Sequence, residues 1–464
     1  MTPDDTIYLI LLLVSTSFGY FVRQVKHVKM KQYVCTLIGF ILLAIVSGFH
    51  ILHPLVLTTV NAVLVLHVKR FCHIVSFAFC FLYLLLIRTS EYFGIPSPPE
   101  ITNTALMIMV LKMVGLAYEI NISCLKQKSD VKEPYLHQIP TFLDIIQYSF
   151  CYVGIFVGPY FKFQTYEDMF TKPYSTNVSH STFLKKRVVV VPLYICLYLV
   201  SDYLFPLSIA VSDEIWKFPF LCRIFLMMVW FFSFRMRIYI AFVLAECICI
   251  NLGLGAYPES TCPKPGAGPT SIHGLYVDEE DSSALKNMTY SFECIRCMDE
   301  FASEFRPTIR EGIRYWNMTV QYWLAIYIYR KTDASKPVKM TITMFVSAIW
   351  HGVRPGYYLS LLGTPLLLIA EIEVEKAFRK NIEKHWLTIY DYIWYCVKMF
   401  SVSYMGLAFI LLDVQSILNY WSSIYYIGHF FTLFMFSIAF LKNNWPRTYT
   451  KRDKFLSVES NKAK

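Results

Sequence analysis

The sequence predicts an all-α, polytopic transmembrane protein, a helical bundle of about eleven spans around a polar-lined chamber. Three observations indicate this class. Of the 464 residues, 56% are hydrophobic and only 16% are charged. Mean hydropathy is +0.44, and apolar runs recur along almost the whole chain. Aromatic residues reach 17%, which suits side-chain belts at both membrane interfaces.

The apolar segments can be placed in order along the chain. The first, 7–22, has no basic region before it, only Asp4 and Asp5, and is predicted to be a span rather than a cleaved leader. Basic residues in 23–31 and in the C-terminal tail predict that both are cytosolic and that the number of crossings is odd. Candidate segments of membrane-span character are 7–22, 34–66 (broken at His53-Pro54), 71–88, 101–120, 141–163, 188–210, 217–233, 236–256, 313–329, 338–352, 356–375, 388–412 and 418–441.

A single membrane-embedded domain is predicted over residues 1–441. Within it, 257–306 is a polar loop, rich in Pro and Gly and carrying an acidic patch at 278–281. This loop is interpreted as a variable linker, with a lid over the chamber as the alternative. Residues 442–464 are predicted to be a basic, partly disordered cytosolic tail.

Charge and cysteine content narrow the functional classes. The net charge of +10 comes from basic residues beside the spans and in the tail, so membrane lipids rather than nucleic acid are the expected partners. Cys294 and Cys297 form a C-x-x-C without a second ligand pair, and no metal site is expected. No internal repeat is present, which speaks against a transporter, the non-enzyme alternative.

Two polar stripes interrupt the apolar segments between 310 and 358. Polar side chains at membrane depth are costly and usually face an interior or a water-filled cavity. The two stripes are therefore predicted to line a shared chamber. Spacings of four, three and four place Arg310, Arg314, Asn317 and Gln321 on one helix face, and spacings of four do so for Thr343, Ser347 and His351.

A simpler interpretation competes with a functional one for both central residues. A lone histidine is more often a satisfied core or interface residue than a catalyst. Asn317 also begins an N-M-T sequon, although an apolar run between Trp316 and Trp323 is a poor place for glycosylation. From the residues alone, both interpretations stay open.

The two motifs resemble the signature of the membrane-bound O-acyltransferase family. They are the R-Y-W-N-M-T run and, 34 positions after its Asn317, the His351 of S-A-I-W-H-G. The runs Tyr152–Pro159 and Phe234–Tyr239 are similar to the lysophospholipid branch. The opening segment, the F-R-M-R run and the H-G-V-R-P-G-Y-Y run most closely resemble the lysophosphatidylinositol acyltransferases.

This resemblance implies a function. The chain would move a fatty acyl chain, polyunsaturated and arachidonoyl-like, from acyl-CoA to the sn-2 hydroxyl of a lysophospholipid, most closely lysophosphatidylinositol. It would do so as a multi-pass protein of the endoplasmic reticulum membrane, in phospholipid remodelling. The alternative is another branch of the family that takes a different lysophospholipid, a sterol or a protein as acceptor.

Acyl transfer explains why these residue types are suited to the chamber. Coenzyme A is already a good leaving group, so the reaction needs a base and a dry, aligned pocket rather than an enzyme nucleophile or a cofactor. His351 would be that base, since a buried imidazole is neutral and accepts a proton. Asn317 would donate amide N–H bonds to the developing oxyanion or orient the acceptor, and the sequence leaves these two roles open. No G-x-S-x-G or H-E-x-x-H motif is present.

Several further residues are candidates for binding the substrates. Arginines offer bidentate donors to the phosphates of acyl-CoA or of the lipid headgroup, although at a membrane boundary they also snorkel without binding anything. Neutral polar groups on the two stripes would complete such a site. The candidates are Arg235, Arg237, Arg310, Arg314, Arg354, Gln321 and Ser347.

Overall fold

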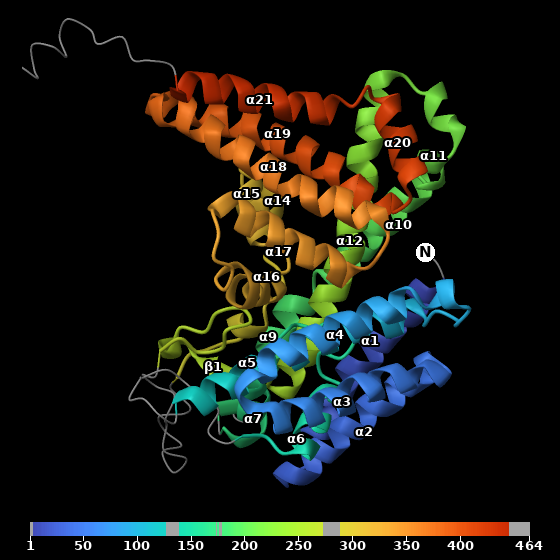
Figure 1. The fold of residues 1–464 in the computed structure, drawn as a ribbon, viewed down its shortest axis with the longest axis vertical. Helices are drawn as coiled ribbons and strands as arrows, with labels where there is room; N and C mark the ends of the chain where they lie inside the picture. The colour runs from blue at the N-terminus through green and yellow to red at the C-terminus, as the bar shows by residue number, and fades with distance from the viewer. Residues whose placement is uncertain (1–2, 127–138, 173, 176–178, 272–287, 445–464) are drawn as a thin grey trace, which may run out of the picture.

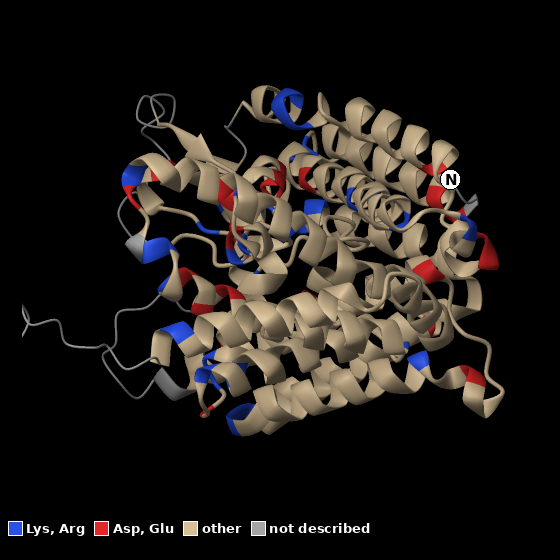
Figure 2. Ribbon diagram, turned by 90° about the horizontal axis from the view of Figure 1, so that it is seen from above, with Lys and Arg blue, Asp and Glu red and all other residues tan. Residues whose placement is uncertain are grey.

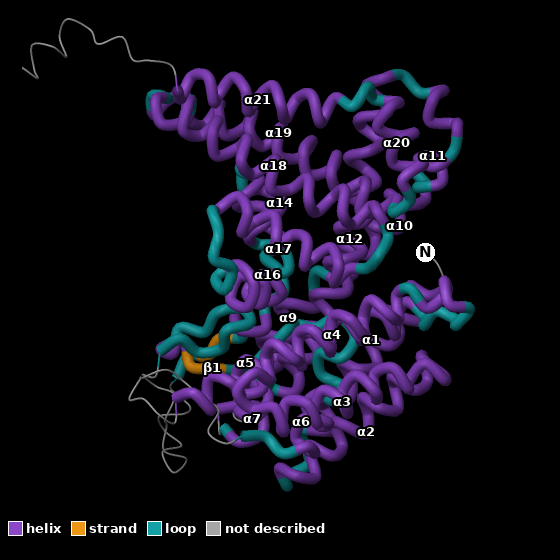
Figure 3. Tube along the Cα trace, viewed as in Figure 1, coloured by secondary structure: helices purple, strands orange, loops and turns teal. Residues whose placement is uncertain are grey.

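The computed structural model describes residues 3–126, 139–172, 174–175, 179–271 and 288–444. It confirms the predicted all-α class, because the described strands are only β1 (Tyr257–Pro258) and β2 (Tyr290–Ser291), which pair antiparallel. Figures 1 and 3 show the N-terminal helices gathered at one end of the molecule and the C-terminal helices at the other. Most charged residues lie near helix ends and in loops (Figure 2), as the membrane prediction requires.

The N-terminal group begins with five long helices. They are α1 (Pro3–Val22), α2 (Val28–Ser47), α3 (Leu52–Val68), α4 (Cys72–Arg88) and α5 (Glu100–Lys126). The break predicted at His53-Pro54 falls slightly earlier, in a 3-10 turn over Gly48–Ile51. Pro54 lies in the first turn of α3, where its missing N–H breaks no intrahelical hydrogen bond.

Three of the predicted spans are wrong in their boundaries. Segment 141–163 is not one helix: α6 (Phe142–Phe150) and α7 (Phe163–Thr171) flank an irregular, mostly buried stretch. Gly154 and Gly158 have positive φ in this stretch, a conformation that interrupts a helix. Segments 217–233 and 236–256 are instead a single helix, α12 (Phe220–Leu252), which follows α9 (His180–Val188), α10 (Val191–Leu204) and α11 (Ser208–Val211).

The C-terminal half places short helices next to long ones. The short ones are α14 (Glu300–Phe305), α15 (Ile309–Arg314) and α16 (Met318–Leu324), the last continuing into a π turn over Ala325–Tyr329. They are followed by α17 (Lys336–His351), α18 (Pro355–Ala377), α19 (Lys384–Leu411), α20 (Val414–Ser423) and α21 (Ile427–Asn444). In Figure 1, α14–α17 lie between the two ends of the molecule.

Six helical stretches in the described residues are long and apolar enough to cross a membrane, or seven if the bent pair α20–α21 counts as one. The longest, Val28–Arg88, contains α2, α3 and α4. The predicted number of about eleven crossings stays a prediction. The helical part of the predicted domain extends to Asn444, while the tail from 445 and the acidic patch at 278–281 lie outside the described residues.

Helix α5 supports the elements that form the site. Its central residues are almost completely buried. The indole Nε1 of Trp323 in α16 donates to the Leu111 carbonyl at 3.0 Å, and that of Trp350 in α17 donates to the Met107 carbonyl at 2.8 Å. Two tryptophans therefore fix α16 and α17 on the same helix of the N-terminal group.

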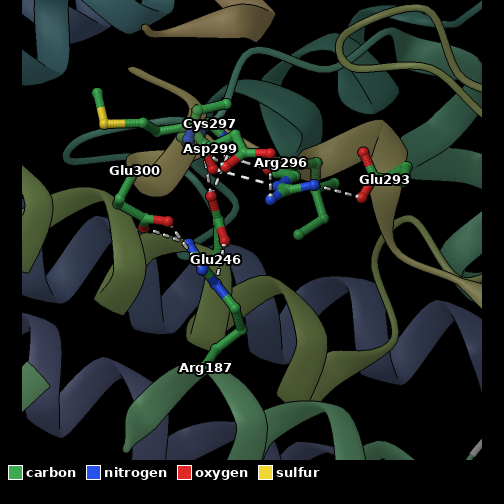
Figure 4. A network of polar contacts seen from close by, with 10 residues as sticks. Arg187, Glu246, Glu293, Arg296, Cys297, Asp299 and Glu300 are labelled. Atoms are coloured by element: carbon green, nitrogen blue, oxygen red, sulfur yellow. Dashed lines mark hydrogen bonds and ion pairs between the residues drawn. The ribbon is translucent and has the colours of Figure 1, made fainter. Parts of the chain in front are cut away.

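A buried ionic network fastens the segment before α14 to α12 (Figure 4). Arg187 in α9 pairs with Glu246 in α12 and with Glu300 in α14, each at 2.7 Å. The Glu246 carboxylate also accepts the backbone N–H of Cys297 at 2.7 Å. Since Glu246 is only 2% exposed, its charge depends on these partners for stabilisation.

Replacing Arg187 with methionine is therefore expected to destabilise the protein. The change leaves the Glu246 and Glu300 carboxylates without their cation, and breaking a buried pair costs on the order of 3–5 kcal/mol. The measurement is the Tm of the detergent-purified variant. Lys217→Met is the matched control, because its pair with Glu214 is exposed and contributes about 0–1 kcal/mol. Equal Tm values for the two variants would contradict a structural role of the network.

Candidate active site

The segment around Asn317 is a break between two helices and not the continuous helix that was predicted. Helix α15 ends at Arg314, and α16 starts at Met318. Asn317 has φ 44° and ψ 54°, a left-handed conformation that asparagine tolerates better than most residues. Because the helix axis changes here, Arg310 and Arg314 do not share a face with Asn317 and Gln321. The predicted stripe is wrong.

Backbone contacts hold this break in place from both sides. The Met318 N–H donates to the Cys297 carbonyl at 2.6 Å, and the Asp299 N–H donates to the Tyr315 carbonyl at 3.1 Å. The segment fastened by the Arg187 network thereby also positions Asn317. At the start of α15, the buried Glu371 carboxylate accepts the N–H groups of Ile309 and Arg310 at 2.6 and 2.8 Å. A negative charge at a helix N-terminus is favourable.

Asn317 lines a cavity with its side chain uncommitted. It occupies the N-cap position of α16, yet its side chain makes no capping hydrogen bond. Its backbone carbonyl accepts the first intrahelical bond, from Gln321 N–H at 3.0 Å. Among the described residues, no hydrogen bond engages the Asn317 amide. Two N–H donors and one carbonyl acceptor are therefore available to a bound molecule.

His351 lines the same cavity from the last position of α17. Its ring centroid lies 4.8 Å from that of Trp350, 4.8 Å from that of Phe409 and 5.6 Å from that of Tyr357. The Trp350–Met107 bond fixes the end of α17, and so the position of the imidazole. In the part of the chain that the structure describes, neither ring nitrogen makes a hydrogen bond.

The cavity measures about 290 Å³ and is mostly apolar. Its walls come from α12, α14–α16, α17, α18 and α19, elements far apart in the sequence. Phenylalanines of α12 and α19, including Phe234, Phe242 and Phe409, form much of the apolar surface. A volume of this kind, with few polar groups and two uncommitted ones, is typical of a small-molecule or lipid site.

Ser347 and Gln321 also line this cavity, as predicted. Ser347 is buried one turn before His351 on α17. The third member of that stripe, Thr343, bonds back to the Lys339 carbonyl and does not line the cavity. The Gln321 amide donates to the carbonyls of Ile313 and Trp316, so it supports the helix break.

Arg235 is the only one of the five candidate arginines that lines the described cavity. Its guanidinium is engaged by the Glu304 carboxylate at 2.7 and 3.2 Å, and the Tyr239 hydroxyl donates to the same carboxylate at 2.5 Å. A guanidinium already paired with a carboxylate is a poor phosphate clamp.

The other four candidate arginines do not line the cavity. Arg237 pairs with Asp5 of α1, and Arg310 pairs with Glu375 of α18 at 3.0 Å; both are about half exposed. Arg314 and Arg354 are exposed. The structure therefore brings together Asn317, His351, Ser347, Gln321 and Arg235, and leaves these four arginines at the periphery.

Lys398 of α19 is a cavity residue that sequence reasoning missed. Its ammonium donates to the carbonyls of Ser303, Glu304 and Arg306, at 3.1, 2.5 and 2.8 Å. It thereby binds the free carbonyls at the end of α14 and holds Glu304 beside Arg235. The available signal was a lysine within the predicted span 388–412, since such residues are rarely without a function.

Within the described ranges, no group of three or more His, Cys, Asp or Glu side chains is arranged to hold a metal ion. Cys294 and Cys297 are buried, and their thiols lie near the backbone carbonyls of Gly255 and Ile295. Nothing in the arrangement of these two cysteines suggests metal ligation.

The long helices of this membrane bundle surround a cavity lined by His351 and Asn317, whose side chains are uncommitted. These features define the class to which the protein belongs. The chain belongs to the MBOAT, or membrane-bound O-acyltransferase, family, whose model matches residues 13–415. It is a multi-pass membrane protein and an O-acyltransferase by family.

Curated relatives extend over nearly the whole chain. The human membrane-bound acylglycerophosphatidylinositol O-acyltransferase MBOAT7 is 36% identical over 93% of each chain. The Xenopus laevis enzyme of the same name is 32% identical over 100% of this chain and 99% of its own. The Drosophila melanogaster membrane-bound acylglycerophosphatidylinositol O-acyltransferase frj is 33% identical over 95% of this chain and 93% of its own.

Proposed function

We propose that this protein transfers a fatty acyl chain from acyl-CoA to the sn-2 hydroxyl of lysophosphatidylinositol, in the endoplasmic reticulum membrane. The observation that carries the proposal is the shared cavity of His351 and Asn317, which have uncommitted side chains and come from separate helices. The acceptor follows from the names of the relatives, each an acylglycerophosphatidylinositol O-acyltransferase.

His351 acts as the general base in this proposal. The imidazole takes the proton of the acceptor hydroxyl, whose oxygen attacks the thioester carbonyl carbon and forms a tetrahedral oxyanion. When the intermediate collapses, the carbon–sulfur bond breaks, and the coenzyme A sulfur leaves with the proton from the imidazolium. The aromatic rings around His351 favour its neutral form between turnovers.

Asn317 donates its amide N–H groups to the oxyanion. A donor suits this role when it is fixed before the reaction and has no competing acceptor. The helix break fixes the backbone of Asn317, and its side chain has no described acceptor. Asn317 could instead orient the acceptor hydroxyl. Loss of an oxyanion donor lowers kcat, whereas loss of an acceptor contact raises KM, so kinetics of a variant distinguish the two roles.

The apolar walls give the acyl chain a place to lie and keep water from the thioester. Excluding water strengthens the interactions of the few polar groups in the cavity and prevents hydrolysis of acyl-CoA. No metal or other cofactor has a role in this sequence of steps. The proposed donor is polyunsaturated, arachidonoyl-CoA in particular, and competition between saturated and polyunsaturated acyl-CoA tests that choice.

Acceptor preference is the direct test of the proposal. In membranes that contain the protein, labelled acyl-CoA should acylate lysophosphatidylinositol faster than the choline, ethanolamine and serine analogues at equal concentration. Membranes with His351→Ala at the same protein level provide the background rate. A preference for lysophosphatidylcholine would contradict the proposed acceptor while leaving acyl transfer intact.

A further inference from the structure

Arg88 brings a guanidinium to the end of α17 that carries His351. It is the last residue of α4, and α4 packs against α17. Its Nη1 lies 3.9 Å from where a Cβ atom would stand on Gly352, the residue after His351. The Arg88 charge interacts electrostatically with both the His351 imidazole and the Tyr357 hydroxyl.

This guanidinium forms no ion pair within 4 Å among the described residues, and the one carboxylate whose charge acts on it, that of Glu100 at the start of α5, is exposed. Arg235, Arg237 and Arg310 each form an ion pair with Glu or Asp, whereas no ion pair in the described part of the chain involves Arg88. The Arg88 Nε atom is buried and makes no hydrogen bond. Arginine stays charged in proteins, and a partly buried charge without a partner is unfavourable. Its position is therefore suited to an anion that arrives with a substrate.

The chemistry of the acceptor supplies such an anion close to His351. In a lysophospholipid, the sn-2 hydroxyl and the phosphodiester are separated by only a few covalent bonds. When the hydroxyl reaches the base, the phosphate must lie beside it. A guanidinium binds phosphate oxygens through two parallel N–H bonds, which also fixes orientation.

We propose that Arg88 binds the phosphodiester of the lysophospholipid acceptor and so places the sn-2 hydroxyl at His351. This inference rests on the proposed function, and it names Arg88 as the residue that binds the phosphate of the proposed acceptor. The headgroup would lie at the Arg88–Gly352 edge, and the lipid chain would enter the apolar cavity past Phe409. Gly352 suits the edge, because its φ of 146° favours glycine and a Cβ there would approach the Tyr357 ring at 3.2 Å.

The test compares acceptors with and without a phosphate. Arg88→Gln should raise the KM for lysophosphatidylinositol by about 10- to 100-fold, the range expected for hydrogen bonds to a charged group. Its kcat, and its KM for monoacylglycerol, which has no phosphate, should stay close to wild type. Arg88→Lys keeps the positive charge but lacks the two parallel N–H donors of the guanidinium, and should show a smaller rise in KM.

Arg70→Gln is the matched control. Arg70 is an exposed arginine just before α4, at the helix end remote from Arg88 and Gly352; neither arginine is among the residues that line the described cavity. Its KM values should equal those of wild type. A binding measurement gives a second readout: lysophosphatidylinositol should raise the Tm of the purified wild type and Arg70→Gln, and raise that of Arg88→Gln much less.

Two results would overturn the proposal. One is an unchanged KM for lysophosphatidylinositol in Arg88→Gln. The other is an equal rise in KM for both acceptors, which would make Arg88 a support of the fold. If the wild type prefers another lysophospholipid, the proposed inositol acceptor fails, and Arg88 is then tested with that lipid against monoacylglycerol, because every lysophospholipid carries the phosphate.

Discussion

Replacing His351 with alanine is expected to abolish acyl transfer while the protein still accumulates in membranes. A positioned general base contributes about 10²–10⁴-fold to the rate, and the other titratable groups described in the lining are already engaged, Glu304 by Arg235 and Lys398 by the carbonyls at the end of α14. The fold should survive, because the imidazole makes no described hydrogen bond and its neighbour Trp350 carries the contact to α5. The measurement is single-turnover transfer from labelled acyl-CoA by purified protein.

His385→Ala is the control for this variant, since His385 is exposed and lies outside the cavity. It should retain full activity. Retention of more than a few per cent of wild-type activity by His351→Ala, at equal protein level, would show that His351 is not the base. Loss of the protein from the membrane fraction would instead assign His351 a structural role.

Asn317→Ala is expected to lower kcat by about 10²–10³-fold with little change in KM, the effect of removing an oxyanion donor. A raised KM at unchanged kcat would assign Asn317 to acceptor binding. Alanine, however, also has to adopt the left-handed backbone conformation of Asn317, at a cost of roughly 1–2 kcal/mol. The alanine variant alone therefore cannot separate the loss of the amide donor from the cost of the backbone conformation.

Asn317→Gly separates the two effects. Glycine adopts the left-handed conformation without a steric cost and has no amide. If the donor matters, Asn317→Gly should lose as much kcat as Asn317→Ala and have a higher Tm. Recovery of most activity in Asn317→Gly would show that asparagine is needed for its backbone conformation.

Sequence reasoning found the helical class and placed Asn317 and His351 in one chamber, because both predictions depend on strong local signals. Long apolar runs predict helices, and the motifs around Asn317 and His351 are short and specific. The continuous stripe from Arg310 to Gln321 was wrong, since helical spacing assumes an unbroken helix and Asn317 breaks it through its own φ. The predicted span 141–163 failed for a similar reason, at glycines with positive φ.

The arginines show a second limit of the sequence. Residue spacing indicates which side chains share a helix face. It cannot show which carboxylate from a distant part of the chain pairs with a given arginine. Arg235 meets Glu304 and Arg310 meets Glu375, each more than sixty positions away in the chain. Arg88, which forms no ion pair among the described residues, is in sequence only the last residue of the predicted span 71–88. Tertiary pairing therefore decided which cations are available.

The wall that α19 contributes to the cavity has a consequence for the biosynthesis of the protein. His351 and Asn317 are already present in a nascent chain that ends before Lys384. That chain still lacks Lys398, Met405 and Phe409, and with them one side of the cavity and the cap on α14. Chemistry at His351 must therefore wait until nearly the whole polypeptide has been inserted, so truncated translation products are expected to be inert toward acyl-CoA.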